Sequence, residues 1–148
     1  MSNNINLPKG VLEDIYRFFK YLFDRGYEID SAANINPGWL AWNVILKKQN
    51  FYVKLEAEKG GLDLLFGSPT KGFMAIRPLI YFLSEGKNYI KAGFFDYSMK
   101  KEADLLEKHI DDIEERFEGE FPATEEEVKI AEAKYFNRKS IWQRILLN

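Results

Sequence analysis

Three stretches of alternating apolar and polar residues follow one another closely in the first half of the chain. They cover residues 39–47, 51–58 and 62–66. A period of two places successive side chains on opposite faces of a strand, so each stretch predicts a strand with one face in a core. The connections, at residues 47–50 and 60–61, are much shorter than the crossover that parallel strands need. The sequence therefore predicts an antiparallel meander of three strands.

An amphipathic helix is expected before the meander. Its apolar residues recur three and four positions apart, as the buried stripe of a helix requires. They are Val11, Leu12, Ile15, Phe18, Phe19, Leu22 and Phe23. Gly26 follows the stretch, at the place where a left-handed residue commonly ends a helix. We expect one unbroken helix over residues 11–25.

Turn-forming residues interrupt the pattern at two points. Residues 34–38 (NINPG) and 67–72 (GSPTKG) have the composition of loops. A helix is expected over residues 76–86, because Pro78 fits its first turn and apolar residues follow at helical spacing. The segment 89–95 fits either a fourth short strand or an extended linker, and both alternatives stay open.

Two more helices are predicted in the last third of the chain. Ser98 is a suitable N-cap for a long helix that ends near Gly119. Thr124 and Glu127 form a capping box that starts another helix. Residues 120–148 are therefore expected to form a separate C-terminal helical arm.

The arm needs a surface to pack on, because a lone helix of this length is marginal in water. Five of its apolar residues lie roughly along one face: Val128, Ala131, Tyr135, Trp142 and Ile145. They could cover the chain's own sheet or a second copy of the chain. A structural homodimer joined by this arm is thus one alternative.

Together these elements predict a single α+β domain over residues 1–148. We expect a small antiparallel sheet of three to four strands with helices packed on one face. The expected order is one helix, three strands, one helix, an optional strand and two helices.

Composition excludes several classes of protein. With 148 residues, of which 46% are hydrophobic and 30% charged, the chain is neither disordered nor fibrous. The lack of cysteine excludes disulfides and thiol catalysis. No stretch approaches the ~20 apolar residues of a membrane span, and the first ten residues lack the apolar segment of a signal peptide, so a cytoplasmic location is expected. The net charge of −2 makes nucleic acid an unlikely partner.

Charge is unevenly distributed along the chain. Residues 100–132 carry a net charge of −8, whereas residues 133–148 carry +4. The long helix contains an acidic run, which consists of Asp111, Asp112, Glu114, Glu115 and Glu118. Concentrated negative charge attracts a basic partner and speeds association. We predict that this run binds a basic protein; the alternative is a solvated helix face.

Three strand carboxylates offer an enzymatic alternative. Glu56, Glu58 and Asp63 could hold a divalent ion that activates water, as in a metal-dependent nuclease or hydrolase. They equally fit the solvated face of a strand. His109 is the only histidine, so neither a catalytic triad nor a histidine-rich metal site can be assembled. We expect no cofactor and no metal, and the question of catalysis stays open.

Two tryptophans flank the start of the sheet. Trp39 and Trp42 are three positions apart, which places them on opposite faces of a regular strand. One is expected in the core. The other, if exposed beside Tyr52, would be a good interface anchor.

Four segments together resemble a known group of proteins. They are VLEDIYRFFKYLFDRGYEI, WLAWNVILKKQNFYVKLEAEKGGLDLLFG, RPLIYFLSEG and ADLLEKHIDDIEERF, within residues 10–118. In element order and amphipathic pattern the chain resembles small bacterial α+β proteins, some of which resemble immunity proteins of polymorphic toxin systems. The resemblance implies a non-enzymatic protein that blocks a toxin by covering its basic active site. It carries no catalytic motif, so it assigns no functional residue.

Overall fold

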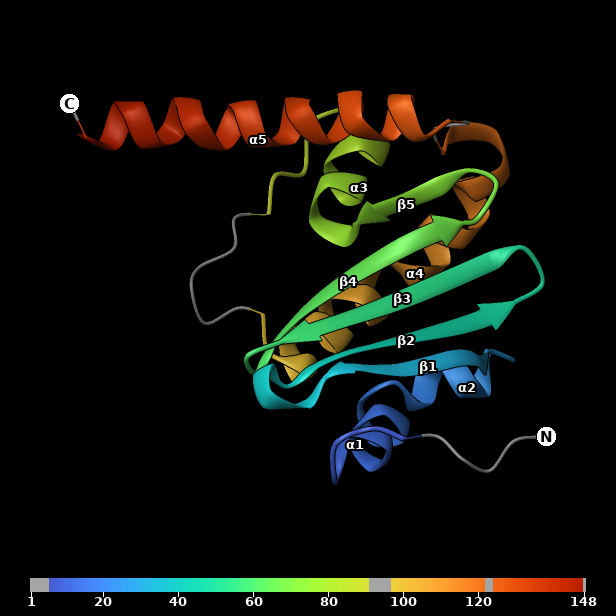
Figure 1. The fold of residues 1–148 in the computed structure, drawn as a ribbon. Helices are drawn as coiled ribbons and strands as arrows, with labels where there is room; N and C mark the ends of the chain where they lie inside the picture. The colour runs from blue at the N-terminus through green and yellow to red at the C-terminus, as the bar shows by residue number, and fades with distance from the viewer. Residues whose placement is uncertain (1–5, 91–96, 122–123, 148) are drawn as a thin grey trace.

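Five antiparallel strands form one sheet, in which each strand pairs with its neighbours in sequence (Figure 1). The computed structural model describes residues 6–90, 97–121 and 124–147 of the chain. The strands are β1 (Glu28–Asn36), β2 (Ala41–Lys48), β3 (Phe51–Glu58), β4 (Gly61–Ser68) and β5 (Gly72–Ala75). A short 3-10 helix, η1 (Pro37–Trp39), joins β1 to β2. The helices are α1 (Val11–Phe18), α2 (Lys20–Asp24), α3 (Ile76–Leu83), α4 (Met99–Glu120) and α5 (Glu125–Leu147).

The core lies between one face of the sheet and helix α4. The register aligns Val44 with Leu55 and Leu64, and these side chains are at most 1% exposed. Helix α4 faces them with a buried stripe formed by Ala103, Leu106, Ile110, Ile113 and Phe117. The inward-facing residues of the strands and the buried stripe of α4 thus form the two halves of one core. The α+β class is confirmed.

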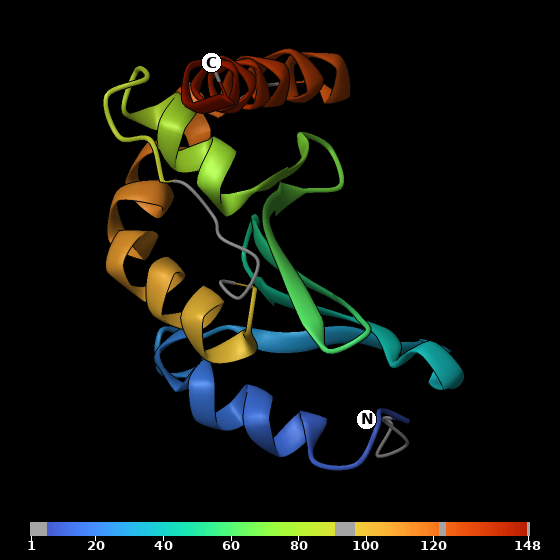
Figure 2. The same ribbon diagram turned by 90° about the vertical axis from the view of Figure 1, so that its left-hand side faces the viewer.

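Helices cover only one face of the sheet. Figure 2 views the sheet from the side, with α3 and α4 to its left, and none of the described α-helices lies against its right side. Helices α1 and α2 lie beside β1 on the side of α4, and α5 runs along α3 and the β5 edge (Figure 1). We refer to the uncovered side as the open face. None of the helices in the described part of the chain is long and apolar enough to cross a membrane.

The predicted first helix is in fact two helices. Phe19 separates α1 from α2, with φ −104° and ψ 21°. The chain tightens there, because the amide of Leu22 donates to the carbonyl of Phe19 only three residues earlier. The predicted stripe is nevertheless buried, since Ile15, Phe19 and Leu22 are all 0% exposed. The expectation of one unbroken helix was wrong, whereas the predicted buried face of the helical segment was correct.

The predicted strand count and element order were also wrong. Residues 34–36, expected in a loop, belong to β1, and residues 67–68 and 72 belong to β4 and β5. In the described part of the chain, the meander therefore has five strands, with two α-helices before it and three after it. Of the ambiguous segment 89–95, residues 89–90 form no regular structure and residues 91–95 lie outside the described residues.

The last two helices begin as predicted. The side chain of Ser98 accepts a hydrogen bond from the Lys101 amide, at 3.3 Å. The Thr124 hydroxyl accepts one from the Glu127 amide, at 3.1 Å. Both caps satisfy helical amides that have no partner within the helix.

The first half of the arm packs on its own domain. Val128, Ala131 and Tyr135 are 3%, 6% and 4% exposed, and α5 contacts both α3 and β5. The Tyr135 hydroxyl donates a hydrogen bond of 2.6 Å to the carbonyl of Ile90. Burial also raises the pKa of Tyr135 to about 12, so its hydroxyl stays a donor. Of the two alternatives for the arm, these three residues take the first, packing on the chain's own domain. The side chains of Trp142 and Ile145 lie outside the described part, so a homodimer through the arm remains a prediction.

Candidate functional site

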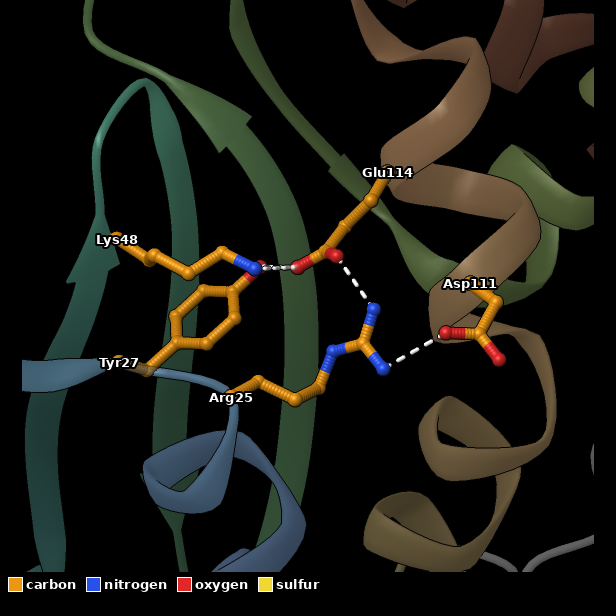
Figure 3. Close-up of polar contacts among 5 residues, drawn as sticks. All are labelled: Arg25, Tyr27, Lys48, Asp111 and Glu114. Carbon is orange, nitrogen blue, oxygen red and sulfur yellow. Dashed lines mark hydrogen bonds and ion pairs between the residues drawn. The ribbon is translucent and has the colours of Figure 1, made fainter.

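Glu114, one of the predicted binding residues, points inward from α4. Its side chain is only 11% exposed and accepts three hydrogen bonds (Figure 3). The donors are the Arg25 guanidinium at 2.5 Å, the Tyr27 hydroxyl at 2.6 Å and the Lys48 ammonium at 2.9 Å. Arg25 follows α2, Tyr27 precedes β1 and Lys48 ends β2. This Glu114 cluster therefore ties α4 to the N-terminal helices and to the sheet.

Hydrogen bonds keep the Glu114 carboxylate ionised. Burial alone would raise the pKa of Glu114, but the hydrogen bonds from Arg25, Tyr27 and Lys48 outweigh it and lower that pKa below its ordinary value. The same contact raises the pKa of Arg25. Burial, followed by the hydrogen bond to Glu114, raises the pKa of Tyr27. The Glu114 carboxylate is thus ionised at neutral pH and turned away from solvent, where it links α4 to the neutral Tyr27 hydroxyl and to the two bases.

Three other members of the acidic run pair with the chain's own bases. Asp111 lies 2.7 Å from Arg25, Asp112 lies 3.1 Å from Arg116, and Glu118 lies 3.7 Å from Lys71. Their carboxylates remain at the surface, since Asp111, Asp112 and Glu118 are 87%, 53% and 63% exposed. Glu115 is exposed as well. The acidic run is therefore partly neutralised by neighbouring residues, which weakens its field.

The three strand carboxylates line one hollow at an end of the sheet. Glu56 on β3 stands directly opposite Asp63 on β4, and Glu58 is two residues further along β3. With other residues they surround an open hollow of about 800 Å³. The remaining lining includes Asn43 from β2 and Tyr97 and Ser98 from the start of α4. The three carboxylates, which the sequence offered either as a candidate metal site or as a solvated strand face, thus line one hollow.

Three carboxylates and one cation, Lys59, line the hollow, and the Lys59 ammonium lies over the Trp39 ring. Glu56 lies 3.9 Å from Lys54, and neither Glu58 nor Asp63 forms an ion pair with a residue that the structure describes. Burial and the proximity of Glu58 raise the pKa of Asp63, although Arg77 opposes this shift.

The geometry does not form a metal centre. Within residues 6–90, 97–121 and 124–147, no group of three or more histidine, cysteine, aspartate or glutamate side chains could hold a metal ion. The three carboxylates share the hollow without converging on one point. The hydrolase hypothesis therefore rests only on their presence in the same concave surface.

A buried ion pair supports the far wall of the hollow. Arg77 on α3 and Glu102 on α4 lie 2.6 Å apart, and their side chains are 8% and 1% exposed. The Arg77 guanidinium also lies 5.0 Å from the centre of the Tyr97 ring. The carbonyl of Tyr97 accepts a hydrogen bond of 2.7 Å from the Leu62 amide, which fixes this segment against the β4 edge.

Exposed apolar side chains border the hollow on its other side. Ile35, Trp39 and Leu40 are 59%, 53% and 52% exposed, around the η1 turn. We call these three residues the apolar tip. Figure 2 shows η1 projecting from the body of the molecule, on the open side of the sheet. A large apolar group that remains in water is a typical feature of an interaction surface.

The apolar tip is held in a fixed conformation. The Lys59 amide donates a hydrogen bond of 2.8 Å to the Trp39 carbonyl. The Lys59 ammonium lies 4.2 Å from the centre of the Trp39 ring, which favours a cation–π contact. Leu40 has a φ of 53°, a left-handed conformation that is costly for a branched side chain. The tip is therefore presented to solvent by the β1–β2 and β3–β4 connections together.

Sequence reasoning identified only some of these residues. As predicted, one tryptophan is buried (Trp42, 5% exposed). The other, Trp39, is exposed, which the sequence left as an alternative. Tyr52 is not beside Trp39, because it pairs with Lys47 at the opposite end of the sheet. His109 is half-buried, and burial lowers its pKa. The sequence did not identify the partners of Glu114, because they lie far from it in the chain and no local pattern marks them. These partners are Arg25, Tyr27 and Lys48.

Comparison with known proteins gives no relative: no family model, curated protein or solved structure matches the chain.

Proposed function

We propose that this chain is a non-enzymatic protein-binding module that holds a basic protein partner. One observation carries the proposal: the apolar tip stands beside the acidic hollow. The tip offers apolar area for burial. The hollow offers three carboxylates, of which Glu58 and Asp63 form no ion pair with a described residue. A partner with an apolar pocket flanked by lysine or arginine side chains is complementary to both.

The apolar tip would supply most of the affinity. Fully burying a leucine or isoleucine side chain contributes about 1.5–3 kcal/mol, and tryptophan is enriched among the residues that dominate binding energy. Because the tip is already rigid, less conformational entropy is lost when it binds. Trp39 is therefore proposed as the anchor residue.

The carboxylates would supply specificity and speed. Glu56, Glu58 and Asp63 face outward, so their field extends into solvent. The exposed acids of α4, Asp111, Asp112, Glu115 and Glu118, add a weaker attraction on another side of the molecule. Such charges raise the association rate more than the final affinity. A toxin with a basic active site would be a partner of this class, in keeping with the resemblance to immunity proteins.

A metal-dependent hydrolase is the second candidate. Its supporting observation is the direct pairing of Glu56 with Asp63 inside a concave surface. Calorimetric titration with Mg²⁺ and Mn²⁺ tests it. Binding that disappears in Glu56→Gln would favour the hydrolase over the binding module.

The binding module is tested with a partner isolated from the source cells by affinity capture and then purified. Calorimetry should show that Trp39→Ala weakens binding by about 2 kcal/mol or more, as expected for an anchor residue. Tyr16→Ala is the matched control, since Tyr16 is also an exposed aromatic residue, 48% exposed, but lies on α1. A neutral double variant, Glu58→Gln with Asp63→Asn, should slow association and reduce its dependence on salt. Equal losses for Trp39→Ala and Tyr16→Ala would contradict the proposal.

A further inference from the structure

The exposed ring of Trp39 is contacted by the turn between β3 and β4. This turn consists of Lys59 and Gly60, since Glu58 pairs with Gly61 across it. The Lys59 amide donates a hydrogen bond of 2.8 Å to the Trp39 carbonyl, and the Lys59 ammonium lies 4.2 Å from the centre of the Trp39 ring. The first contact holds the backbone of η1, and the second holds the side chain. Lys59 thus binds Trp39 through two separate groups.

The backbone of this turn is unfavourable for a lysine. Lys59 has a φ of 53° and Gly60 a φ of 84°, so both residues are left-handed. A two-residue hairpin loop of this kind favours asparagine, aspartate or glycine at its first position. A lysine there has a conformational cost that a glycine avoids. The lysine adds what a glycine cannot supply, which is an ammonium over the Trp39 ring.

The Lys59 ammonium lies against the ring instead of a carboxylate. Lys59 lines the hollow together with Glu56, Glu58 and Asp63. Nevertheless, none of these carboxylates forms an ion pair with it in the part of the chain that the structure describes. The contact with the ring therefore leaves the carboxylates of Glu58 and Asp63 available to a basic partner, while the exposed tryptophan is held in place.

We propose that Lys59 is the positioning residue of the anchor Trp39. This inference rests on the proposed function, because it concerns the residue that is proposed there as the anchor. The ammonium restricts the ring to one orientation before a partner arrives, which reduces the conformational entropy that is lost on binding. Lys59 acts through Trp39 and makes no contact with the partner that this role requires.

Three variants separate the side chain of Lys59 from its backbone. Lys59→Met keeps the amide and an unbranched side chain but removes the ammonium. Lys59→Gly removes the whole side chain and relieves the left-handed backbone. Gln49→Gly is the matched control, because Gln49 has a φ of 54° in the turn at the other end of β3. All three variants keep the backbone amide that donates to Trp39 in the wild-type chain or lie far from it.

The first measurement is the mobility of the Trp39 indole, obtained from ¹⁵N relaxation of its N–H group. In the wild-type chain and in Gln49→Gly, its order parameter should be near the ~0.85 of a rigid backbone N–H group. In both Lys59 variants it should fall below about 0.6. The indole of the buried Trp42 is an internal reference and should not change. A Trp39 indole that is equally rigid with and without the ammonium would overturn the proposal, whether or not a partner is known.

Urea denaturation separates positioning from a role in the stability of the fold. The urea midpoint of Lys59→Gly should be no lower than that of the wild-type chain, because glycine relieves the left-handed backbone. A lower midpoint would show that Lys59 stabilises the fold itself and would overturn its assignment as a positioning residue.

Binding of the captured and purified partner gives the last measurement. Both Lys59 variants should weaken binding about two- to tenfold, since one more side chain must then be fixed on association, and Gln49→Gly should not. If Trp39→Ala weakens binding but Lys59→Met does not, this proposal fails and the proposed function stands. If Trp39→Ala leaves binding unchanged, the proposed function fails, and the indole measurement still decides whether Lys59 positions the ring.

Discussion

The Glu114 cluster gives the most direct test of how this fold is stabilised. Replacing Glu114 with alanine removes the acceptor of three hydrogen bonds. Lys48 and the Tyr27 hydroxyl then lose this partner, whereas Arg25 keeps its ion pair with Asp111. Breaking a buried ion pair on one side typically costs about 3–5 kcal/mol. Arg25 and Lys48 are 29% and 21% exposed and can turn partly toward water, so we expect a loss of about 3 kcal/mol. That is a large share of the roughly 5–15 kcal/mol that stabilises a domain.

The effect should depend on pH in a defined direction. The pKa of Glu114 is lower in the folded chain than in the unfolded chain, whose value is about 4.3. Ionised Glu114 therefore stabilises the fold fully above pH ~4.3, and this contribution is lost as the pH falls through the folded-state pKa. In Glu114→Gln the contribution is absent at every pH. The stability difference between the wild-type chain and this variant should thus be largest at neutral pH and shrink in acid.

Urea denaturation at a series of pH values, followed by circular dichroism, measures both effects. The neighbouring exposed residue supplies the control, because Glu115→Ala should change stability by no more than about 0.5 kcal/mol. A loss below about 1 kcal/mol for Glu114→Ala would refute the claim that this carboxylate links α4 to the sheet. A stability difference between Glu114→Gln and the wild-type chain that is independent of pH would refute the assigned direction of the pKa shift.

Three further perturbations test the packing. Phe19→Ala should cost about 3–5 kcal/mol in denaturant unfolding, because the ring is 0% exposed; a loss under about 1 kcal/mol would mean that Phe19 is not a core residue. Gly67→Ala should lower the melting temperature, because its Cβ would meet the β5 backbone, whereas Gly119→Ala, with open space around it, should stabilise α4 by up to about 1 kcal/mol. Equal effects of the two alanines would contradict the close approach. Deleting residues 122–148 should lower the melting temperature strongly, because it exposes the surface of α3 and β5 that α5 covers. Light scattering should show an unchanged oligomeric state. Conversion of a dimer to a monomer would instead support the arm as the dimer interface.

Local pattern in the sequence was sufficient for the elements that carry strong periodicity. The strands β2 and β3, the stripe of α4 and both helix caps were all predicted, since each depends on residues close together in the chain. Strand β1 was missed because residues 28–36 alternate poorly. Its pairing with β2 contains two irregularities, at Asp30 and Ile35, that disrupt a period of two. Strand β5 was missed because it has only four residues and follows a loop.

The candidate site could likewise be predicted only in part from the sequence. The acidic composition of α4 could be read from the sequence, but the inward orientation of Glu114 could not. That orientation depends on bases that the fold brings from α2, the start of β1 and the end of β2. The grouping of Glu56 with Asp63 follows from the β3–β4 register, which the short turn at residues 59–60 fixes. Register within a hairpin is local information, whereas the packing of a helix on a distant strand is not.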